Sequence, residues 1–432
     1  MKVKNFSFTN VDDFKRALFV LKAELGSVNP TRLYFQIHSV VLDEQKLQPV
    51  WNAIEDMFPG SPWFGNSTSG NIVDCDGAAE ISVTATIFEK DSTRFKLFQY
   101  DLGSAPSCDI AKQIVAESKN HPWVKAIEMY HTISAESTTS FCEGMDGLAP
   151  EIQMFGAIVC SPDITSSKSC VFSSEGGFNS KGLLILFFGG DEFYVESLKI
   201  SGWKSIGRHF LVTKAEGSTL YELGGVPAYE IYRKYLGIQN DENFFYNALD
   251  FPILYEHNGT SIVRAPAASN PDGSLTMSSD VEVGSVISLS YGEPLTIVDS
   301  IQQESEKIKK MNPDVLHIFD CAARKAFWTG QDSTLEIQPF KHIAGSSGFF
   351  SHGEFLREKG HLNQHNITLV VAAMREGYGK GLQASAYRKQ EIKTSKLPLA
   401  ARMATFIRET SAEVDELNKQ LDAYKRHFNE TR

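Results

Sequence analysis

The chain has 432 residues, which is too long for one ordinary hydrophobic core, so we expect two domains of roughly 150 to 220 residues each. Apolar residues make up 42% and charged residues 22%, the balance of a globular protein rather than a disordered one. The net charge of -11 and the lack of any basic run exclude a surface built to bind a nucleic acid backbone.

The first part of the chain alternates helical and strand patterns. Residues 11–25 and 43–57 carry apolar side chains at helical spacing, and residues 33–41 between them are rich in β-forming side chains. A strand is predicted at 79–88 and a helix at 109–118. This opening predicts an α/β layer.

Short β runs separated by Gly, Ser and Asp follow between residues 156 and 213, as expected for an antiparallel sheet with hairpins. A helix is predicted at 221–236. The polar and aromatic stretch 240–256 has no clear period and is expected to be a boundary. The second half predicts strands at 261–264, 286–291, 315–319 and 367–374 and a helix at 294–311.

We therefore expect a mixed α+β (α/β) protein with two lobes, residues 1–238 and 239–390, divided near residue 238. Each lobe should hold a mainly antiparallel or mixed sheet with flanking helices. No short-period repeat is visible, although the two halves could be a distant structural duplication.

The C-terminal segment 396–432 has a heptad pattern, with a mostly apolar seam in alternating steps of four and three: Met403, Ile407, Thr410, Val414, Leu417, Leu421, Tyr424 and Phe428. A lone helix would leave this stripe in water, so a parallel coiled-coil homodimer is expected. The alternative is a helix that folds back onto its own domain.

The string Gly189-Gly190-Asp191-Glu192-Phe193 matches the signature of diguanylate cyclases. A hard cation needs oxygen ligands from several segments, and no neighbouring stretch resembles the rest of that family. We interpret the string as an Asp-containing turn between two buried strands, and a diguanylate cyclase, or a fragment of one, is the alternative.

Other catalytic and metal-binding patterns are missing from the sequence. The six cysteines contain no Cys-x-x-Cys pair, and no histidine pair has the context of a helical zinc site. No nucleophile has a recognisable partner, so we expect no enzyme and no metal site. The longest apolar runs are too short to span a membrane, and a cytoplasmic protein is expected.

Several stretches are similar to the motifs of one family. They are Pro62 to Ile72 with Gly65, Ser67, Thr68 and Gly70; Ser201 to Gly207; Glu222 to Gly237; Val315 to Arg324; Gly348-Phe-Phe-Ser-His-Gly-Glu354; and His365-Asn-Ile-Thr-Leu369. Their order resembles the FIST family of intracellular sensors, with an N-terminal FIST domain over 1–238 and a C-terminal one over 239–390. Phe155 to Ile158 departs from the family's glycine-rich loop.

The resemblance implies a ligand-sensing protein that regulates a histidine kinase, a cyclic-di-GMP enzyme such as a diguanylate cyclase, or a chemotaxis partner. The C-terminal helix would be the coupling element. One branch of the family resembles nitric-oxide sensors that bind haem b. If haem binds, an imidazole must reach the iron from an apolar pocket, and the candidates are His365, His317 and His352.

If the ligand is instead an amino acid or another small carboxylate, Arg324 could clamp the carboxylate while Glu354 meets an amino group. Ser67 and Thr68 lie in a loop rich in hydroxyls that could also bind a carboxylate or carbonyl ligand, and a structural turn is the alternative there. The alternative is an Arg-Glu pair that only ties strands together, and a pure scaffold without a ligand is a further alternative.

Overall fold

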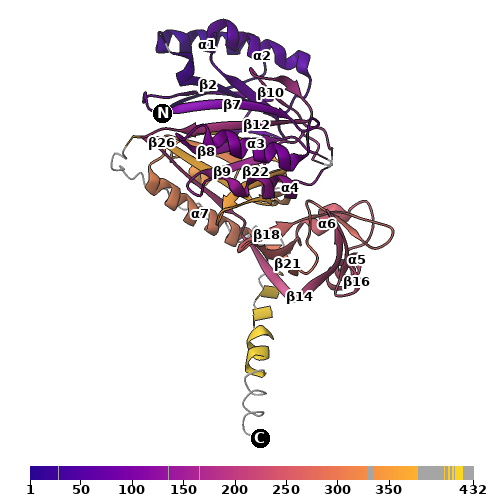
Figure 1. Ribbon diagram of the computed structural model, residues 1–432. Helices are drawn as coiled ribbons and strands as arrows, with labels where there is room; N and C mark the ends of the chain where they lie inside the picture. The colour runs from indigo at the N-terminus through magenta and orange to yellow at the C-terminus, as the bar shows by residue number, and fades with distance from the viewer. Residues whose placement is uncertain are drawn as a thin grey trace. The chain divides into compact units, whose positions relative to one another are not determined.

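The computed structural model describes residues 1–27, 29–134, 136–164, 166–328 and 334–377, with 403, 407–408, 411–412 and 414–421. These residues form mixed sheets with flanking helices (Figure 1), which confirms the expected α+β class. No described helix is both long enough and apolar enough to cross a membrane.

The chain forms two compact units that are not consecutive in sequence. Unit 1 holds Met1–Ser201, Asn258–Thr260 and Ile301–Tyr387, and unit 2 holds Gly202–His257, Ser261–Ser300 and Arg388–Arg432. The expected division near residue 238 does not describe this packing, because the chain enters unit 2 already after Ser201 and returns to unit 1 later.

Unit 1 contains three six-stranded sheets. The first sheet has the order β1-β6-β2-β3-β10-β11. Its strands are β1 Lys2–Phe8, β6 Ile81–Ile87, β2 Leu33–Ser39, β3 Trp63–Ser67, β10 Val171–Ser173 and β11 Gly177–Asn179. The helices α1 (Val11–Leu25) and α2 (Glu44–Met57) pack together over one face of this sheet (Figure 1), in a shared apolar cluster.

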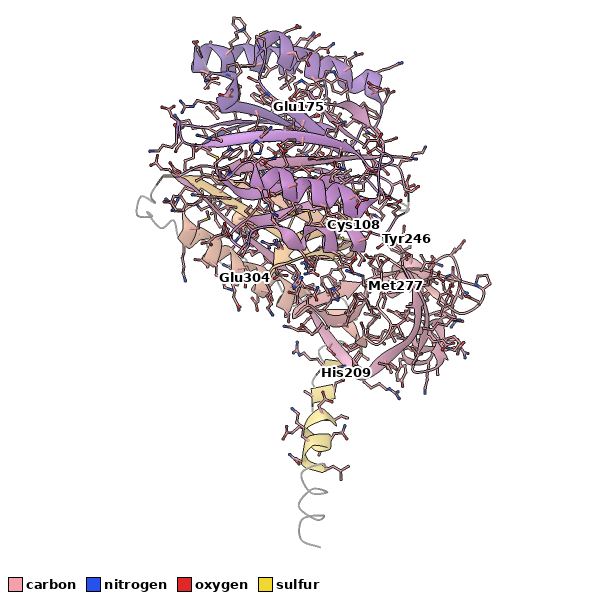
Figure 2. The ribbon with its side chains drawn as sticks, viewed as in Figure 1. Cys108, Glu175, His209, Tyr246, Met277 and Glu304 are labelled. Carbon is pink, nitrogen blue, oxygen red and sulfur yellow. The ribbon has the colours of Figure 1, made fainter. Side chains whose placement is uncertain are left out.

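The second sheet has the order β7-β12-β8-β9-β24-β25. Its strands are β7 Arg94–Asp101, β12 Gly182–Gly189, β8 Val124–His131, β9 Gln153–Ile158, β24 Gly353–Glu358 and β25 His361–His365. The helices α3 (Ser107–Lys119) and α4 (Thr139–Gly144) pack on it. Cys108, which Figure 2 labels, lies on α3 and is the one described cysteine that is not fully buried.

The third sheet has the order β13-β26-β22-β23-β4-β5. Its strands are β13 Phe193–Ile200, β26 Leu369–Glu376, β22 Val315–Cys321, β23 Gly345–Ser351, β4 Asn71–Val73 and β5 Asp76–Gly77. The helices α7 (Pro294–Met311) and α8 (Ala322–Phe327) precede and follow β22 along the chain.

The three sheets have the same pairing pattern. In each, one central pair of neighbours is parallel, β2 with β3, β8 with β9 and β22 with β23, and the remaining pairs are antiparallel. Along the chain each repeat runs strand, helix, strand, helix, strand, hairpin, strand. Unit 1 is therefore built from three repeats rather than from the two halves that a duplication would give.

Each repeat gives its hairpin to another sheet. The hairpin β4–β5 of the first repeat pairs with β23, β10–β11 of the second pairs with β3, and β24–β25 of the third pairs with β9. The third repeat also carries a long insertion between β13 and α7, which supplies the strands of unit 2. No sheet of unit 1 is complete without a second repeat.

A glycine marks the same register position in each parallel pair. Gly65 lies opposite Ile37, Gly156 opposite Met129 and Gly348 opposite Ile318. A Cβ atom at Gly156 or Gly348 would come within 2.0 Å of the carbonyl oxygen of the opposite residue, and within 2.5 Å at Gly65. Only glycine allows this approach of the two backbones.

Unit 2 is a curled antiparallel sheet with the order β18-β17-β21-β14-β15-β20-β19. Its strands are β14 Trp203–Glu216, β15 Thr219–Leu223, β16 Val226–Pro227, β17 Ile253–His257, β18 Thr260–Arg264, β19 Pro266–Ser269, β20 Leu275–Met277 and β21 Val286–Gly292. Only Ala265 separates β18 from β19, the two ends of this strand order, and the strands of unit 2 share one apolar core.

Two local predictions in unit 2 differ from the structure. The helix expected at 221–236 begins only at Ala228, as α5 (Ala228–Leu236), because β15 and the left-handed pair Gly224-Gly225 occupy its first part. The boundary expected at 240–256 contains α6 (Phe244–Leu249) and the start of β17.

The described part of the C-terminal segment is helical. Ile407 packs against the core of unit 2, and Arg408 pairs with Glu293. Val414, Leu417 and Leu421 are 55%, 63% and 50% exposed. Met403 is exposed as well, whereas the start at residue 396 and the positions Thr410, Tyr424 and Phe428 lie outside the described residues.

The repeat geometry makes one stability prediction. Gly156→Ala and Gly348→Ala should each destabilise the chain by about 3 kcal/mol or more, because the new methyl group meets a backbone carbonyl that cannot move aside. Gly77→Ala is the control, because nothing lies within 4 Å of its added Cβ. Urea unfolding measures the change in unfolding free energy of each variant. Equally small changes in all three variants would contradict the strand register of the parallel pairs.

Candidate functional site

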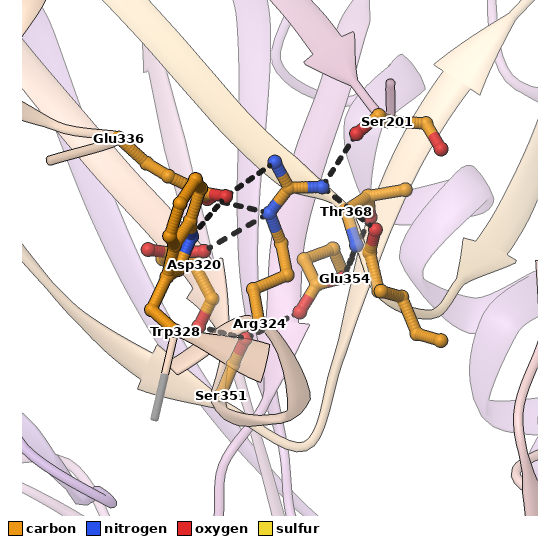
Figure 3. A network of polar contacts seen from close by, with 9 residues as sticks. Ser201, Asp320, Arg324, Trp328, Glu336, Ser351, Glu354 and Thr368 are labelled. Carbon is orange, nitrogen blue, oxygen red and sulfur yellow. Dashed lines mark hydrogen bonds and ion pairs between the residues drawn. The ribbon is translucent and has the colours of Figure 1, made fainter. Parts of the chain in front are cut away.

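The carboxyl ends of β22 and β23 hold most of the charge that unit 1 buries. Ligands of sheets with parallel strands commonly bind at such ends. Asp320 is the next-to-last residue of β22, Arg324 lies one turn later on α8, and both are 1% exposed or less. We define the strand-end cluster as these two residues with Trp328, Glu336, Ser351, Glu354 and Thr368 (Figure 3).

Arg324 is the centre of the strand-end cluster. Its Nε and Nη2 atoms donate to the two carboxylate oxygens of Glu336 at 2.6 and 2.9 Å. Its Nη1 atom donates to the carbonyl oxygens of Ser201 and Ile367 at 2.7 and 2.9 Å. The predicted clamp on a ligand carboxylate would therefore have to displace Glu336, which already takes the bidentate edge of the guanidinium.

Glu354 faces hydroxyl groups rather than Arg324. Ser351 Oγ and Thr368 Oγ1 each donate to its carboxylate at 2.6 Å, from β23 and from the turn before β26. Burial raises the pKa of Glu354 to about 8, although these hydrogen bonds act in the opposite direction. Burial therefore favours the neutral, protonated form of Glu354 near neutral pH.

Asp320 is the least satisfied member of the strand-end cluster. Its Oδ1 atom lies 3.7 Å from Arg324 Nε and accepts no hydrogen bond from a described residue. Burial and the neighbouring charge of Glu336 raise the pKa of Asp320 well above its usual range. A buried carboxyl with an unused oxygen can accept a donor from a ligand.

The other two repeats carry different side chains at the position of Asp320. Ser39 in the first sheet and His131 in the second occupy the same place in the parallel register. The fold therefore does not need a carboxyl there. The charge gathers at one of three equivalent strand ends, which marks that end as specialised.

Lys325 is a residue that the sequence reasoning missed. It is partly buried on α8, its Nζ atom donates to the carbonyl oxygen of Ser69 at 3.0 Å, and it lies 5.0 Å from the Phe350 ring centre. Burial lowers its pKa. Lys325 could have been noticed in the sequence because it directly follows Arg324. Only the fold shows that its side chain reaches the turn after β3.

Ser67 and Thr68 shape that turn. Ser67 Oγ accepts from the Cys170 backbone N–H at 2.9 Å, and Thr68 Oγ1 donates to Asn71 Oδ1 at 2.7 Å. Gly70 carries no side chain where Lys325 approaches, since a Cβ atom there would lie 3.1 Å from Nζ. The turn and Lys325 are therefore in contact beside the strand-end cluster, although Ser67 and Thr68 are themselves 0% exposed.

The three histidine candidates lie on different elements and are not gathered around one point. His317 on β22 is fully buried, with Nδ1 at 2.7 Å from Glu128 Oε2. His365 ends β25, with Nε2 at 3.7 Å from Glu358. His352 lies between β23 and β24, and burial lowers its pKa.

His317 has the donor arrangement of a haem ligand, since a carboxylate orients one ring nitrogen while Nε2 makes no hydrogen bond with a described residue. Its surroundings do not fit a haem. The ring is 0% exposed and packs edge-on against Phe188, inside the apolar core enclosed by the sheets. A macrocycle could reach it only if those sheets separated.

The string Gly189 to Phe193 joins β12 to β13, the end of one repeat to the start of the next. A Cβ atom at Gly189 would lie 1.9 Å from the Trp123 carbonyl oxygen, and one at Gly190 would lie 2.0 Å from that of Ser92. Close packing therefore explains why both positions are glycine, in agreement with the interpretation of the string as a turn. Among the described residues no group of three His, Cys, Asp or Glu side chains could hold a metal ion.

Comparison with known families gives two matches. A family model described as the FIST N domain matches residues 37–226, and one described as the FIST C domain matches residues 228–357. No curated protein matches the chain. The second match includes β22 and β23, and with them Asp320, Arg324 and Glu354.

The raised pKa of Glu354 makes stability depend on pH. The folded chain keeps a proton on Glu354 up to about pH 8, whereas the unfolded chain releases it near the ordinary value of 4.5. Stability should therefore fall as pH rises through this window, by up to about 1.4 kcal/mol per pH unit from this group. Glu354→Gln should remove that part of the slope.

Urea unfolding at pH 5, 6.5 and 8 measures this slope. Glu306→Gln on α7 is the matched control, because Glu306 is exposed and its loss should leave the slope unchanged. An identical pH dependence of stability in wild type and Glu354→Gln would contradict the raised pKa of Glu354.

Proposed function

The chain belongs to the FIST family, whose domains are sensor domains of signal transduction, and from that premise we propose a cytoplasmic sensor of a small carboxylate, bound at the strand-end cluster. The observation that carries the proposal is the concentration of buried charge. Of the five Asp, Glu, Arg and Lys residues of unit 1 that are buried as whole residues in the described part of the chain, four belong to this cluster: Asp320, Arg324, Glu336 and Glu354.

Lys325 takes the role expected for Arg324. A lysine ammonium has three donors, and Lys325 uses one of them on the Ser69 carbonyl. A ligand carboxylate would meet the remaining donors, at a position that is partly exposed and so open to a solute. An amino group on the same ligand would meet Asp320 Oδ1, so an amino acid matches both ends.

Signal output would pass through the C-terminal helix. Val414, Leu417 and Leu421 form an exposed apolar stripe with polar side chains on the other side, and Ile407 fixes the start of the helix to unit 2. A second copy of the chain would cover the stripe as a parallel dimer. The expected partner is a histidine kinase, a diguanylate cyclase or a chemotaxis protein.

Haem b with nitric oxide is the second candidate function: His317 Nε2 has the donor arrangement of a haem ligand, but haem could reach it only if the sheets around it separated. An absorption spectrum of the purified chain after haem addition, in the ferrous state with and without nitric oxide, tests it. A saturable Soret band that is lost in His317→Ala would establish this candidate. Without such a band, the carboxylate proposal stands alone.

The ligand proposal predicts a thermal shift. Among the twenty amino acids and small dicarboxylates such as succinate, at least one should raise the melting temperature saturably. Lys325→Met should weaken that ligand at least about tenfold, because a charge-assisted hydrogen bond is lost. Lys341→Met, which removes an ion pair with Asp76, is the control and should leave affinity unchanged. Equal affinity in both variants would contradict the role of Lys325.

The dimer proposal predicts a change in mass. Leu417→Asp should convert the dimer to a monomer in sedimentation equilibrium, because the charge falls on the apolar stripe. Ala412→Asp places the same charge on an exposed position about half a turn away from the stripe and should stay dimeric. A monomeric wild type would show that the stripe serves another partner.

A further inference from the structure

Arg324 joins the strand-end cluster to two backbone segments that meet at one end of the third sheet. Its Nη1 atom donates to the carbonyl oxygens of Ser201 and Ile367 at 2.7 and 2.9 Å, and Figure 3 shows the bond to Ser201. Ser201 directly follows β13, and Ile367 lies two residues before β26. Ile200 of β13 pairs with Leu369 of β26. Arg324 therefore ties the two strands together just beyond the end of their ladder.

Ser201 is the residue at which the chain leaves unit 1. The first segment of unit 1 ends there, and unit 2 begins at Gly202. Gly202 has a φ of +88°, and a Cβ atom on it would lie 2.7 Å from Cγ1 of Ile297. Trp203 is 4% exposed and pairs with Gly292, where a Cβ atom would lie 2.7 Å from the indole ring. The chain is therefore held on both sides of this crossing, without a free residue between the two units.

Ile367 has a backbone conformation that its own side chain opposes. Its φ is +54°, and among the described residues it is the one β-branched residue with a positive φ. Such a conformation persists only where the surroundings hold it. The peptide group between Ile367 and Thr368 gives its oxygen to Arg324 and its N–H to Glu354 Oε2, at 2.9 and 3.3 Å. The strand-end cluster therefore holds this strained turn from both sides.

Arg324 and Lys325 are neighbours on α8, a helix of six residues. Lys325 is the residue proposed to meet a ligand carboxylate, and Arg324 makes the ties to the two carbonyl oxygens. Because the two residues share one short helix, a shift of Lys325 toward a ligand also moves Arg324. Hydrogen bonds weaken steeply as their geometry departs from the ideal, so the ties respond to such a shift.

Arg357 on β24 makes similar ties without either feature. Its Nη1 and Nη2 atoms donate to the carbonyl oxygens of Leu148, Ala149 and Ile152 at 2.9 to 3.0 Å. These three residues lie inside the first segment of unit 1, and none of them has a positive φ. A tie between an arginine and the backbone therefore does not by itself require a chain crossing or a strained turn, whereas Arg324 holds both.

We propose that Arg324 is the coupling residue of the sensor, which transmits occupancy of the strand-end cluster to unit 2 through Ser201. The strained turn at Ile367 is the element that relaxes when Arg324 moves. The C-terminal helix belongs to unit 2, so this route joins the site to the output. The inference rests on the proposed function for its stimulus, but the tie between Arg324 and Ser201 can be tested without a ligand.

Hydrogen–deuterium exchange of the full chain, compared between wild type and Arg324→Lys, tests this tie. Lysine keeps the positive charge beside Glu336, but it lacks the planar fork that reaches the carboxylate and two carbonyl oxygens together. Exchange should become about fivefold faster at residues 202–206 and at 366–370, the effect expected for one lost hydrogen bond.

Arg357→Lys is the matched control, because it removes ties of the same kind inside unit 1 and should leave exchange at 202–206 unchanged. Unchanged exchange at 202–206 in Arg324→Lys, or an equal increase in both variants, would overturn the coupling role. If Arg324→Lys does not fold, the double variant Arg324→Gln with Glu336→Gln takes its place, since it removes both charges of the buried pair.

A second arm uses L-glutamate as the probe, because it carries both carboxylate and amino groups. The coupling role predicts that a saturable thermal shift of the wild type is accompanied by a changed exchange rate at 202–206. A thermal shift with unchanged exchange there would contradict the coupling and leave the proposed function intact. If neither L-glutamate nor another amino acid or dicarboxylate shifts the melting temperature, the proposed function fails, and the comparison of variants still decides the tie.

Discussion

The exchange of hairpins among three repeats is the constraint on which the rest of unit 1 depends. Each sheet takes two strands from another repeat, so no repeat can satisfy its backbone hydrogen bonds alone. The N and C domains of the family divide the chain between 226 and 228, yet the second sheet needs β24 and β25 from beyond that point. The two family domains are therefore parts of one cooperative fold in this chain.

A repeated framework also explains where specialised chemistry can be found. The register glycines are common to all three repeats because the backbone geometry requires them. Ser39, His131 and Asp320 occupy equivalent register positions but differ in chemistry. Packing of the repeat therefore does not determine which residue type stands there. Buried charge at the third position is a departure from what stability alone would select.

Long amphipathic helices were predictable because their pattern is local. The helices expected at 11–25 and 294–311 match α1 and α7 to the residue. The helix expected at 221–236 was wrong in its first part, because short β segments with glycine turns can mimic helical spacing. The mixed α+β class and the family were predicted correctly, but the threefold repeat was not, since strand partners far apart in sequence leave no local signal.

The candidate site was predictable only where its residues lie in local sequence motifs. Arg324 and Glu354 were found by resemblance, and both lie in the strand-end cluster, but their partners Glu336, Ser351 and Thr368 come from separate segments. Ile367 also lies in one of these motifs, but its positive φ was not predictable, because a β-branched residue rarely adopts that conformation.

The most direct test of the sensor account is hydrogen–deuterium exchange of the full chain, with and without the amino acid or dicarboxylate that raises its melting temperature most. The account predicts slower exchange at the strand-end cluster, around Asp320 to Trp328, together with a changed rate in the helix Val414 to Leu421. Protection at the cluster with an unchanged helix would contradict signal output through that helix. Protection elsewhere in the chain, with the cluster unchanged, would contradict the site itself.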